Sequence, residues 1–277
     1  MLLSIITINF NNRDGLRRTC ESVIGQSCRE FEFIVIDGGS TDGDREVIQE
    51  YEAHFDFWSS MPDNGVYHAM NKGVRAAHGE YVLFLNSGDT FYDHDVVKQM
   101  LPLLKDCDVL TGGTWLSSGR LIPAPRAATM AFLYGATLCH QSSFIRRELL
   151  LEMPYDEDLR YVSDWKFWVQ ALVYRNGVYQ SSDVVISNYD WNGMSTVNYK
   201  EVEQEKEQAL LSFFPKKVLD DYHKSVVGDN WEDKLYIAIK GSRFHAVIYT
   251  FNVCLIKFLQ LFKKGAFWIK EYPLRLK

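Results

Sequence analysis

Short apolar runs alternate with amphipathic stretches along the first part of the chain. The runs Leu2–Phe10, Phe31–Ile36 and Tyr81–Leu85 are continuous and rich in β-branched and aromatic residues, which is the pattern of strands buried on both faces of a mostly parallel sheet. Between them, residues 16–24 and 66–77 carry apolar side chains at helical spacing, which favours helices that cover the sheet. The pattern predicts an α/β fold of Rossmann type, with a mostly parallel central sheet flanked by helices.

Weaker signals predict the remaining elements. We expect helices over 45–53, 95–104, 165–172 and 201–213, a helix start at 146, and strands at 57–60, 108–113, 140–145 and 177–189. The 201–213 helix has charges of alternating sign, which is typical of a helix exposed to solvent. Because the strand–helix alternation weakens beyond about residue 115, we expect three regions: a first half-domain at 1–112, a second half of the same domain at 113–198, and a C-terminal helical extension at 199–277.

Composition and charge narrow the function classes. The 277 residues are 47% hydrophobic, enough for a sizeable core. The net charge of -6 argues against nucleic-acid binding, which usually needs a basic face. The five cysteines have no CxxC spacing, and the N-terminus begins directly with an apolar strand without a basic leader region. Both observations predict a cytoplasmic protein.

The C-terminal region is basic although the chain is acidic. From Lys240 onward there are eight Lys or Arg residues and one acid, Glu271. The nineteen residues of Phe244–Phe262 are interrupted by polar side chains such as Asn252 and Lys257, which makes them marginal for a membrane span. Two alternatives remain: a helix lying in the membrane interface, or a helix packed on the main domain. An anionic membrane surface, at the inner face of the cell membrane, is therefore a candidate partner of residues 240–277.

Candidate chemistry follows two of the buried strands. Asp37–Gly43 combines three glycines with carboxylates, and Asn86–Asp89 follows the strand at 81–85. Ligands of open α/β sheets bind outside the carboxyl ends of the strands, where glycines let the backbone approach a ligand. No GxGxxG follows the first strand, so this is not the dinucleotide fingerprint. Asp89 could hold Mg²⁺ or Mn²⁺ against a diphosphate; the simpler alternative is an Asp that closes a Gly-containing turn.

Five stretches resemble, in order, the motifs of GT-A-fold family 2 glycosyltransferases, especially the bacterial polysaccharide subgroup that includes colanic-acid-type enzymes. They are Ser4–Asn9, Ile34–Gly43, Asp63–Gly73, Leu83–Asp89 and Ser163–Trp165. Each motif alone is moderately specific, and five at the family's spacing are strongly so. The resemblance covers residues 1–195. It implies an inverting transfer of a sugar from a nucleotide-diphosphate sugar to a glycan or lipid-linked acceptor.

The resemblance also implies roles for single residues. Asp37 would accept a hydrogen bond from the nucleotide base, and Asp89 would coordinate a divalent cation, Mn²⁺ or Mg²⁺, between the donor phosphates. Asp164 would be the general base that takes the acceptor's proton; a helix N-cap is the alternative. The implied donor-binding residues are Thr7, Asn9, Asp37, Ser40, Asp63, Lys72, Asn86 and Ser87, and the implied acceptor-binding residues are His140 and Gln141.

Two departures from the family pattern keep other function classes open. Positions 86 and 88 are Asn and Gly where the family often has acids, and His68 stands where the subgroup usually has Asp. A non-catalytic, membrane-associated GT-A-like scaffold would explain the thinned acids, although the retention of Asp37 and Asp164 argues against it. A sugar nucleotidyltransferase is the other alternative, but its Gly-rich basic loop is missing, because 9–12 are Asn, Phe, Asn and Asn.

Overall fold

A computed structural model describes residues 1–189 and 198–223. The basic segment 240–277, including 244–262, lies outside the described residues. The chain divides into two compact units, Met1–Leu219 and Asp220–Lys277. Residues 199–219 belong to the first unit, and the division into 1–112, 113–198 and 199–277 stays a prediction. In the described part of the chain, no helix is long and apolar enough to cross a bilayer.

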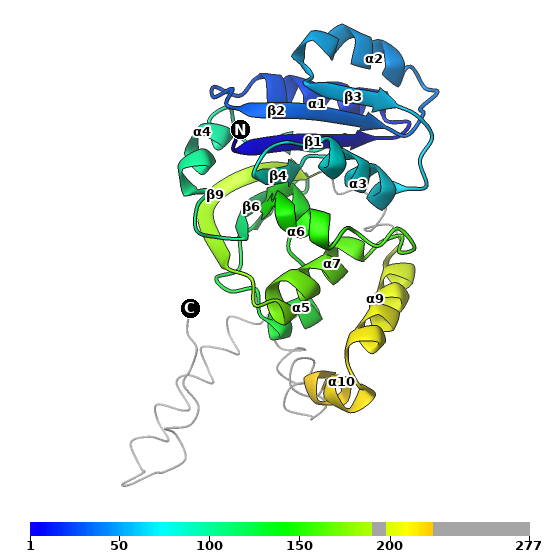
Figure 1. The fold of residues 1–277 in the computed structure, drawn as a ribbon, viewed down its shortest axis with the longest axis vertical. Coiled ribbons are helices and arrows are strands. Elements are labelled where there is room, and N and C mark those ends of the chain that lie inside the picture. Colours follow the sequence, from blue (N-terminus) through cyan, green and yellow to red (C-terminus); the bar gives the residue numbers. More distant parts are fainter. Residues whose placement is uncertain (190–197, 224–277) are drawn as a thin grey trace. The chain divides into compact units, whose positions relative to one another are not determined.

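The described residues form one nine-stranded sheet in the order β3-β2-β1-β4-β8-β6-β9-β5, with β7 paired to β6 (Figure 1). The strands are β1 (Leu3–Asn9), β2 (Phe31–Asp37), β3 (Phe57–Ser60), β4 (Tyr81–Phe84), β5 (Thr90–Phe91), β6 (Val109–Leu116), β7 (Leu121–Ile122), β8 (Ser143–Arg146) and β9 (Tyr179–Tyr189). β1 to β4 are mutually parallel, and β6 and β9 share their direction because β8 is antiparallel to both β4 and β6. The predicted mostly parallel sheet is confirmed.

The helices are α1 (Arg13–Ile24), α2 (Asp44–Tyr51), α3 (Val66–Ala76), α4 (Val96–Met100), α5 (Met130–Gly135), α6 (Arg147–Glu152), α7 (Ser163–Trp168), α9 (Tyr199–Phe213) and α10 (Lys216–Tyr222). Short 3₁₀ turns are η1 (Glu52–His54), η2 (Leu101–Leu103) and η3 (His140–Ser142), and a π-helical segment, η4 (Val169–Tyr174), continues α7.

Two expected elements are corrected. The helix expected over 95–104 ends at Met100 and continues as the turn η2, which contains Pro102; proline has no N–H to donate to a continuing helix. The strand expected at 140–145 begins only at Ser143, because residues 140–142 form η3, closed by a hydrogen bond from Ser142 N to Cys139 O at 3.0 Å.

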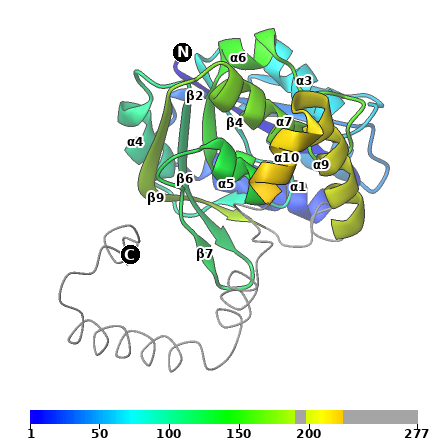
Figure 2. The ribbon, with the colours of Figure 1, turned by 90° about the horizontal axis from the view of Figure 1, so that it is seen from below.

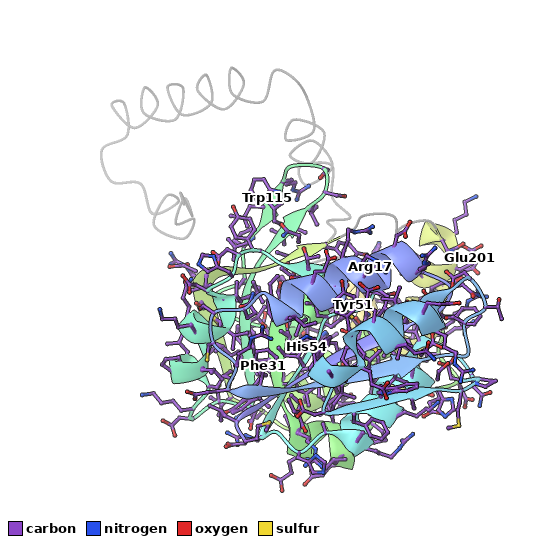
Figure 3. The ribbon with its side chains drawn as sticks, turned by 90° about the horizontal axis from the view of Figure 1, so that it is seen from above. Arg17, Phe31, Tyr51, His54, Trp115 and Glu201 are labelled. Atoms are coloured by element: carbon purple, nitrogen blue, oxygen red, sulfur yellow. The ribbon has the colours of Figure 1, made fainter. Side chains whose placement is uncertain are left out.

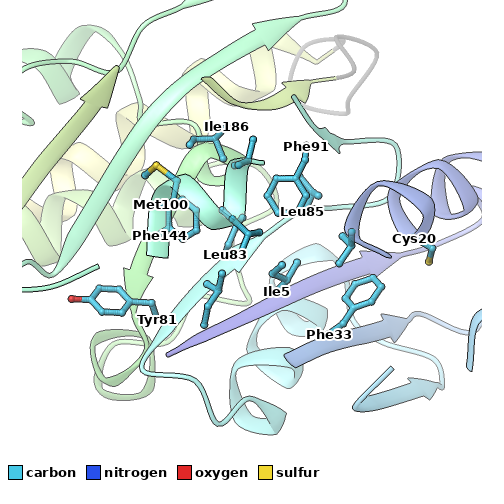
Figure 4. Close-up of a cluster of buried hydrophobic side chains, with 14 of the residues drawn as sticks. Ile5, Cys20, Phe33, Tyr81, Leu83, Leu85, Phe91, Met100, Phe144 and Ile186 are labelled. Carbon is cyan, nitrogen blue, oxygen red and sulfur yellow. The ribbon is translucent and has the colours of Figure 1, made fainter. Parts of the chain in front are cut away.

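One face of the sheet is covered by α1, α2 and α4. Figure 4 shows the apolar cluster between them, in which Ile5, Phe33 and Leu83 of the strands meet Cys20 of α1 and Met100 of α4. These side chains are at most 2% exposed. On the outer side of this layer, the α1 residue Arg17 lies beside Tyr51 of α2 (Figure 3) and donates to the Glu50 carboxylate at 2.7 Å, so the two helices are also linked at the surface.

The opposite face is covered by α3, the helix that carries most of the third motif. Met70 and Val74 of α3 are buried, as the helical stripe predicts. Gly73 brings the helix close to the sheet: a Cβ at this position would lie 2.5 Å from Ile6 Cγ2 of β1. Because real side-chain contacts are never so short, only glycine fits here without a shift of β1 or α3. The close packing fixes the last turns of α3 against β1 and β2.

Candidate active site

The carboxyl ends of β1, β2 and β4 bring the first polar motif residues together. Asn9 pairs in register with Asp37 at the ends of β1 and β2, and Ser87 N donates to Ile8 O at 3.0 Å just after β4. Asn12, which precedes α1, donates from its amide to Ser87 O at 3.0 Å. The strand-end residues of three separate motifs therefore form one edge, as the parallel arrangement predicts.

Asp37 is 1% exposed, and its carboxylate is occupied by its own surroundings. Oδ1 accepts from Asn9 Nδ2 at 2.9 Å and from Ser40 Oγ at 2.5 Å, and Oδ2 accepts from Ser60 Oγ at 2.6 Å. Burial alone would raise the pKa of Asp37, but these hydrogen bonds outweigh it and lower the pKa. The carboxylate thus holds the loop after β2 in shape. Direct contact with a nucleotide base would have to displace one of these donors.

Two further buried side chains support the same edge. Thr7, expected among the donor contacts, is fully buried and donates from Oγ1 to Leu85 O at 2.8 Å, which ties β1 to the end of β4. Asp44, which sequence reasoning missed, is also fully buried and accepts from Asn9 Nδ2 at 2.7 Å. Burial, the largest cause, raises the pKa of Asp44. Thr7 and Asp44 support the strand ends from inside the protein, so other side chains at this edge must face a ligand.

Phe10 is the exposed group that sequence reasoning missed. It follows β1 directly and is 63% exposed. A Cβ at Gly38 would lie 3.1 Å from the Phe10 ring and 2.8 Å from Asp63 Oδ2, so the ring, the glycine and this carboxylate adjoin one another. An exposed aromatic ring beside a glycine at the ends of parallel strands is suited to stack on a nucleotide base. The signal in the sequence was an aromatic residue at the last position of an apolar strand run.

The turn that carries Asp89 is held by α1. Thr19 Oγ1 donates to Asp89 O at 2.7 Å and accepts from Gly88 N at 3.0 Å. Gly88 has φ of 105°, a conformation that residues with a side chain rarely adopt. Asp89 is 6% exposed. Thr19 and Gly88 together fix the direction in which the Asp89 backbone enters β5.

The side chains of this turn are suited to a divalent cation that is also bound by the diphosphate of a substrate. Within residues 1–189 and 198–223, no three His, Cys, Asp or Glu side chains gather as a complete metal site. Asn86 Oδ1 is buried and has no hydrogen-bond partner in the described part of the chain, and the backbone of Asp89 donates to Asn86 O at 2.9 Å. Carboxylate, amide and phosphate oxygens are the ligands that Mg²⁺ and Mn²⁺ prefer. Asp89 would hold such an ion together with the diphosphate of the donor.

Asp164 lies in the first turn of α7 and is held by three donors. Oδ1 accepts from Tyr67 Oη at 3.0 Å and from Trp165 N at 2.8 Å, while Oδ2 lies 3.1 Å from His140 Nδ1. The N-cap position of α7 is Val162, so Asp164 does not cap the helix. Its side chain is 15% exposed. The carboxylate is therefore fixed in one orientation and still open to a ligand at its exposed side.

His140 connects Asp164 to the strand-end edge. Its Nε2 lies 3.2 Å from Asn86 Nδ2, on the residue that follows the β4 run. Burial alone would lower the pKa of His140, but the hydrogen bond and charge of Asp164, together with the charge of Asp89, outweigh burial and raise the pKa. The adjacent Gln141 is 4% exposed. The turn η3 thus places His140 between Asp164 and the turn after β4, while Gln141 lies inside the protein.

The third motif supports Asp164 from α3, which the sequence did not reveal. Tyr67 is 6% exposed, and burial raises its pKa well above the ordinary value, so its hydroxyl keeps the proton that it donates to Asp164. Asn71 makes two hydrogen bonds with the backbone of Tyr155. Its Nδ2 donates to Tyr155 O at 2.8 Å, and its Oδ1 accepts from Tyr155 N at 3.0 Å. The Tyr155 ring packs 5.7 Å from Phe84 of β4. Lys72, the expected donor contact on this helix, is half-exposed.

Comparison with known proteins identifies the family. A profile described as Glycosyl transferase family 2 matches residues 4–152, more than half of the chain. The chain belongs to this family, and it is a glycosyltransferase. An uncharacterized glycosyltransferase of Mycobacterium tuberculosis is 36% identical over 178 residues, which are 61% of this chain and 68% of that protein. The putative teichuronic acid biosynthesis glycosyltransferase TuaG of Bacillus subtilis is 36% identical over 36% of this chain and 40% of its own length.

Solved structures show the same fold. TarS of S. aureus, residues 1–349 in complex with UDP-GlcNAc, superposes with a TM-score of 0.63 at 18% identity over 84% of this chain and 78% of that one. The mannosyltransferase PcManGT of Pyrobaculum calidifontis, in complex with GDP-Man and Mn²⁺, gives 0.62 at 15% identity over 91% and 79%. A longer TarS chain is spanned over only 43% of its length. The expected GT-A architecture is confirmed.

Proposed function

We propose that the chain catalyses an inverting transfer of a sugar from a nucleotide-diphosphate sugar to a glycan or lipid-linked acceptor. The observation that carries this proposal is the built environment of Asp164. A carboxylate with three hydrogen-bond donors, partly open to solvent, is linked through His140 to the turn that follows β4. An inverting displacement needs such a fixed carboxylate on the acceptor's side of the sugar.

In the proposed reaction, Asp164 Oδ2 takes the proton of the acceptor hydroxyl. The acceptor oxygen forms a bond to the anomeric carbon as the bond from that carbon to the phosphate oxygen breaks, and the nucleoside diphosphate leaves with the electron pair. Tyr67 and His140 do not react; they hold the carboxylate at the angle that the attack requires. When bound, a divalent cation at Asp89 neutralises charge on the departing diphosphate.

On the donor side, Phe10 stacks on the nucleotide base and Asp63 lies at the edge of the same surface. Asn86 and Ser87 line the turn that faces the phosphates. Thr7, Asn9, Asp37 and Ser40 act mainly by holding this surface in shape. Their hydroxyls, the Asn9 amide nitrogen and the Asp37 carboxylate are engaged with one another or with the backbone. The donor base and sugar are those that this surface selects; UDP-GlcNAc and GDP-mannose are the first candidates to test, since structural neighbours hold them.

A donor panel separates this proposal from the two alternatives. The full-length chain is incubated with Mn²⁺ and either UDP-GlcNAc, GDP-mannose, or a nucleoside triphosphate plus a sugar 1-phosphate, and released phosphate species are measured. A glycosyltransferase releases nucleoside diphosphate from a nucleotide sugar. Pyrophosphate from the triphosphate reaction would instead support a nucleotidyltransferase, and no release from any mixture, with wild-type Asp164 and Asp89, would support a scaffold.

The biological setting proposed is bacterial surface polysaccharide synthesis at the cytoplasmic face of the membrane. One relative is named for teichuronic acid biosynthesis, and the last 38 residues are basic and interleaved with aromatics, notably Phe258, Phe262 and Trp268. Each basic residue near an anionic surface contributes about 1 kcal/mol of binding. Attraction to an anionic leaflet would bring the site close to a lipid-linked acceptor.

Cosedimentation of the full-length chain with anionic vesicles at low salt tests the membrane part. The variant carries glutamine at four basic positions of the C-terminal region: Lys257, Lys263, Lys264 and Lys270. The control carries glutamine at four exposed lysines elsewhere: Lys98, Lys105, Lys200 and Lys216. We expect only the first variant to lose vesicle binding. Equal binding by both, or none by the wild type, would remove the membrane from the proposal.

A further inference from the structure

Helix α9 binds the backbone of the segment that precedes Asp164. The Glu205 carboxylate accepts hydrogen bonds from three successive backbone N–H groups: Arg160 at 2.7 Å, Tyr161 at 2.6 Å and Val162 at 2.9 Å. Val162 is the N-cap residue of α7, so these three N–H groups belong to the segment that enters the helix. A carboxylate from a helix distant in the sequence therefore fixes the backbone directly before α7.

The next residue of α9 contacts Trp165, the residue that follows Asp164. Lys206 Nζ donates to Tyr134 O at 3.0 Å and lies 5.2 Å from the centre of the Trp165 ring. The Trp165 indole is 3% exposed and donates to Leu133 O at 2.7 Å. Burial, the largest cause, lowers the pKa of Lys206. Figure 2 shows α9 beside α7 and α5, the elements that carry these partners.

The two contacts bracket Asp164 in the sequence, since Glu205 binds the residues just before it and Lys206 contacts the residue just after it. This arrangement corrects the expectation that the 201–213 helix is simply solvated: its exposed face carries Glu203 and Glu207, while Ala209 and Leu210 are buried. Two of the charged residues of this helix, Glu205 and Lys206, thus contact other segments of the fold.

We infer that Glu205 is a positioning residue for glycosyl transfer, which acts by fixing the 160–162 backbone and thereby the place of Asp164, with Lys206 as the second contact of the same clamp. The inference rests on the proposed role of Asp164 as base. A displacement of a reacting group by about 1 Å costs on the order of a hundredfold in rate, so a clamp on the segment that carries the base affects turnover without touching substrate.

The test uses the full-length chain with three single variants. Glu205→Ala removes the acceptor of all three N–H groups, Glu205→Gln keeps the shape but replaces one oxygen by a donor, and Glu207→Gln changes an exposed acid on the same helix as control. Turnover is measured with UDP-GlcNAc or GDP-mannose, whichever the wild type consumes. We expect kcat to fall about tenfold or more in Glu205→Ala and less in Glu205→Gln, with donor KM and the control unchanged.

Hydrogen exchange provides a readout that needs no substrate. Loss of the carboxylate should speed exchange at the amides of 160–162 by about tenfold, while the amides of β1, β2 and β4 stay protected. Unchanged exchange at 160–162 overturns the inference. If Glu205→Ala does not fold, as its exchange in β1 would show, the comparison is made with Glu205→Gln.

A double-mutant cycle separates positioning from general stability. If Glu205 acts through Asp164, adding Glu205→Ala to Asp164→Asn should change kcat little, because the base is already lost. Additive losses, or faster exchange with unchanged kcat in the single variant, mean that the contact is structural only and overturn the inference. Full activity of Asp164→Asn would be a different failure: it would remove the proposed base and reduce Glu205 to a loop contact, which the exchange data would still report.

Discussion

His140 Nδ1 lies 3.1 Å from Asp164 Oδ2, and the opposite ring nitrogen lies 3.2 Å from the Asn86 amide. One imidazole thus bridges the two halves of the site. The sequence placed His140 in the acceptor pocket. We propose a positioning role instead, because both ring nitrogens contact side chains of the protein itself.

His140→Gln should therefore lower kcat by about tenfold and leave the affinity for donor nearly unchanged, because Asp164 loses one of the three donors that orient it. Steady-state kinetics with varied donor and varied acceptor distinguishes this from an acceptor contact. A rise in acceptor KM with unchanged kcat would contradict the positioning role and return His140 to the acceptor pocket. His94→Gln, at an exposed histidine, is the matched control.

Asp164→Asn keeps the size and most hydrogen-bonding capacity of the side chain but cannot take a proton. We expect transfer to slow by about a hundredfold or more while nucleotide binding persists. Isothermal titration with UDP or GDP and a rate assay measure the two quantities separately. The exposed Asp158, changed to Asn in the same loop region, serves as control; wild-type turnover of Asp164→Asn would rule out the proposed base.

Asp89→Asn tests the proposed cation contact. The variant should remain folded, because the turn is held by Thr19 through backbone atoms, but Mn²⁺ should no longer stimulate donor turnover. Asp106→Asn is a suitable control, since Asp106 is exposed and has φ of 55°, a conformation that Asn tolerates well. Equal Mn²⁺ stimulation of Asp89→Asn and the wild type would show that Asp89 does not hold the ion.

The buried carboxylate of Glu32 makes the stability of the folded state depend on pH. It is 4% exposed at the opposite end of the sheet, where it accepts hydrogen bonds from Ser4 Oγ, His78 N and Gly79 N. Burial alone would raise the pKa of Glu32, but these bonds outweigh it and lower the pKa from 4.5. The charged form is therefore favoured in the folded state, so its contribution is full above pH 4.5 and is lost as pH falls through the folded pKa.

Glu32→Gln should reduce the free energy of unfolding by about 1–3 kcal/mol at pH 7, and the difference from wild type should shrink below pH 4.5. Urea unfolding at pH 7, 5 and 4 measures this. The exposed neighbour Glu30, changed to Gln, is the control. A difference that stays constant or grows as the pH falls would show that the Glu32 charge does not stabilise the fold.

The sequence predicted the parts of the fold that depend on local pattern. β1, β2 and β4 were visible as apolar runs, and the glycines and acids after them marked the site edge. The two-residue strand β5 was missed, because Thr90 and Phe91 pair with residues of β9, almost one hundred residues away in the chain. Pattern reasoning has no access to partners at such separation.

The supporting residues of the site were missed for the same physical reason. Asn71 lies off the apolar stripe of α3, which predicts exposure, yet Tyr155 covers it. Nothing in the sequence pattern of α3 indicates that Tyr67 binds Asp164. Glu205 was assigned to a solvated helix because alternating charges carry no sign of a buried partner. In each case a polar side chain is bound by a segment distant in the sequence, and its role is visible only once the chain has folded.

The place of β8 in the sheet bears on how the chain is made. β8 lies between β4 and β6, although both precede it in the sequence, and its short run at Ser143–Arg146 pairs with Tyr81 and Val82 on one side and with Val109–Thr111 on the other. While a ribosome is still adding residues before 143, β4 and β6 both lack β8 as a neighbour. The strand edges that β8 will cover are then open to other chains. We expect nascent chains stalled in this interval to depend on chaperones, and those stalled beyond the α6 segment to depend on them less.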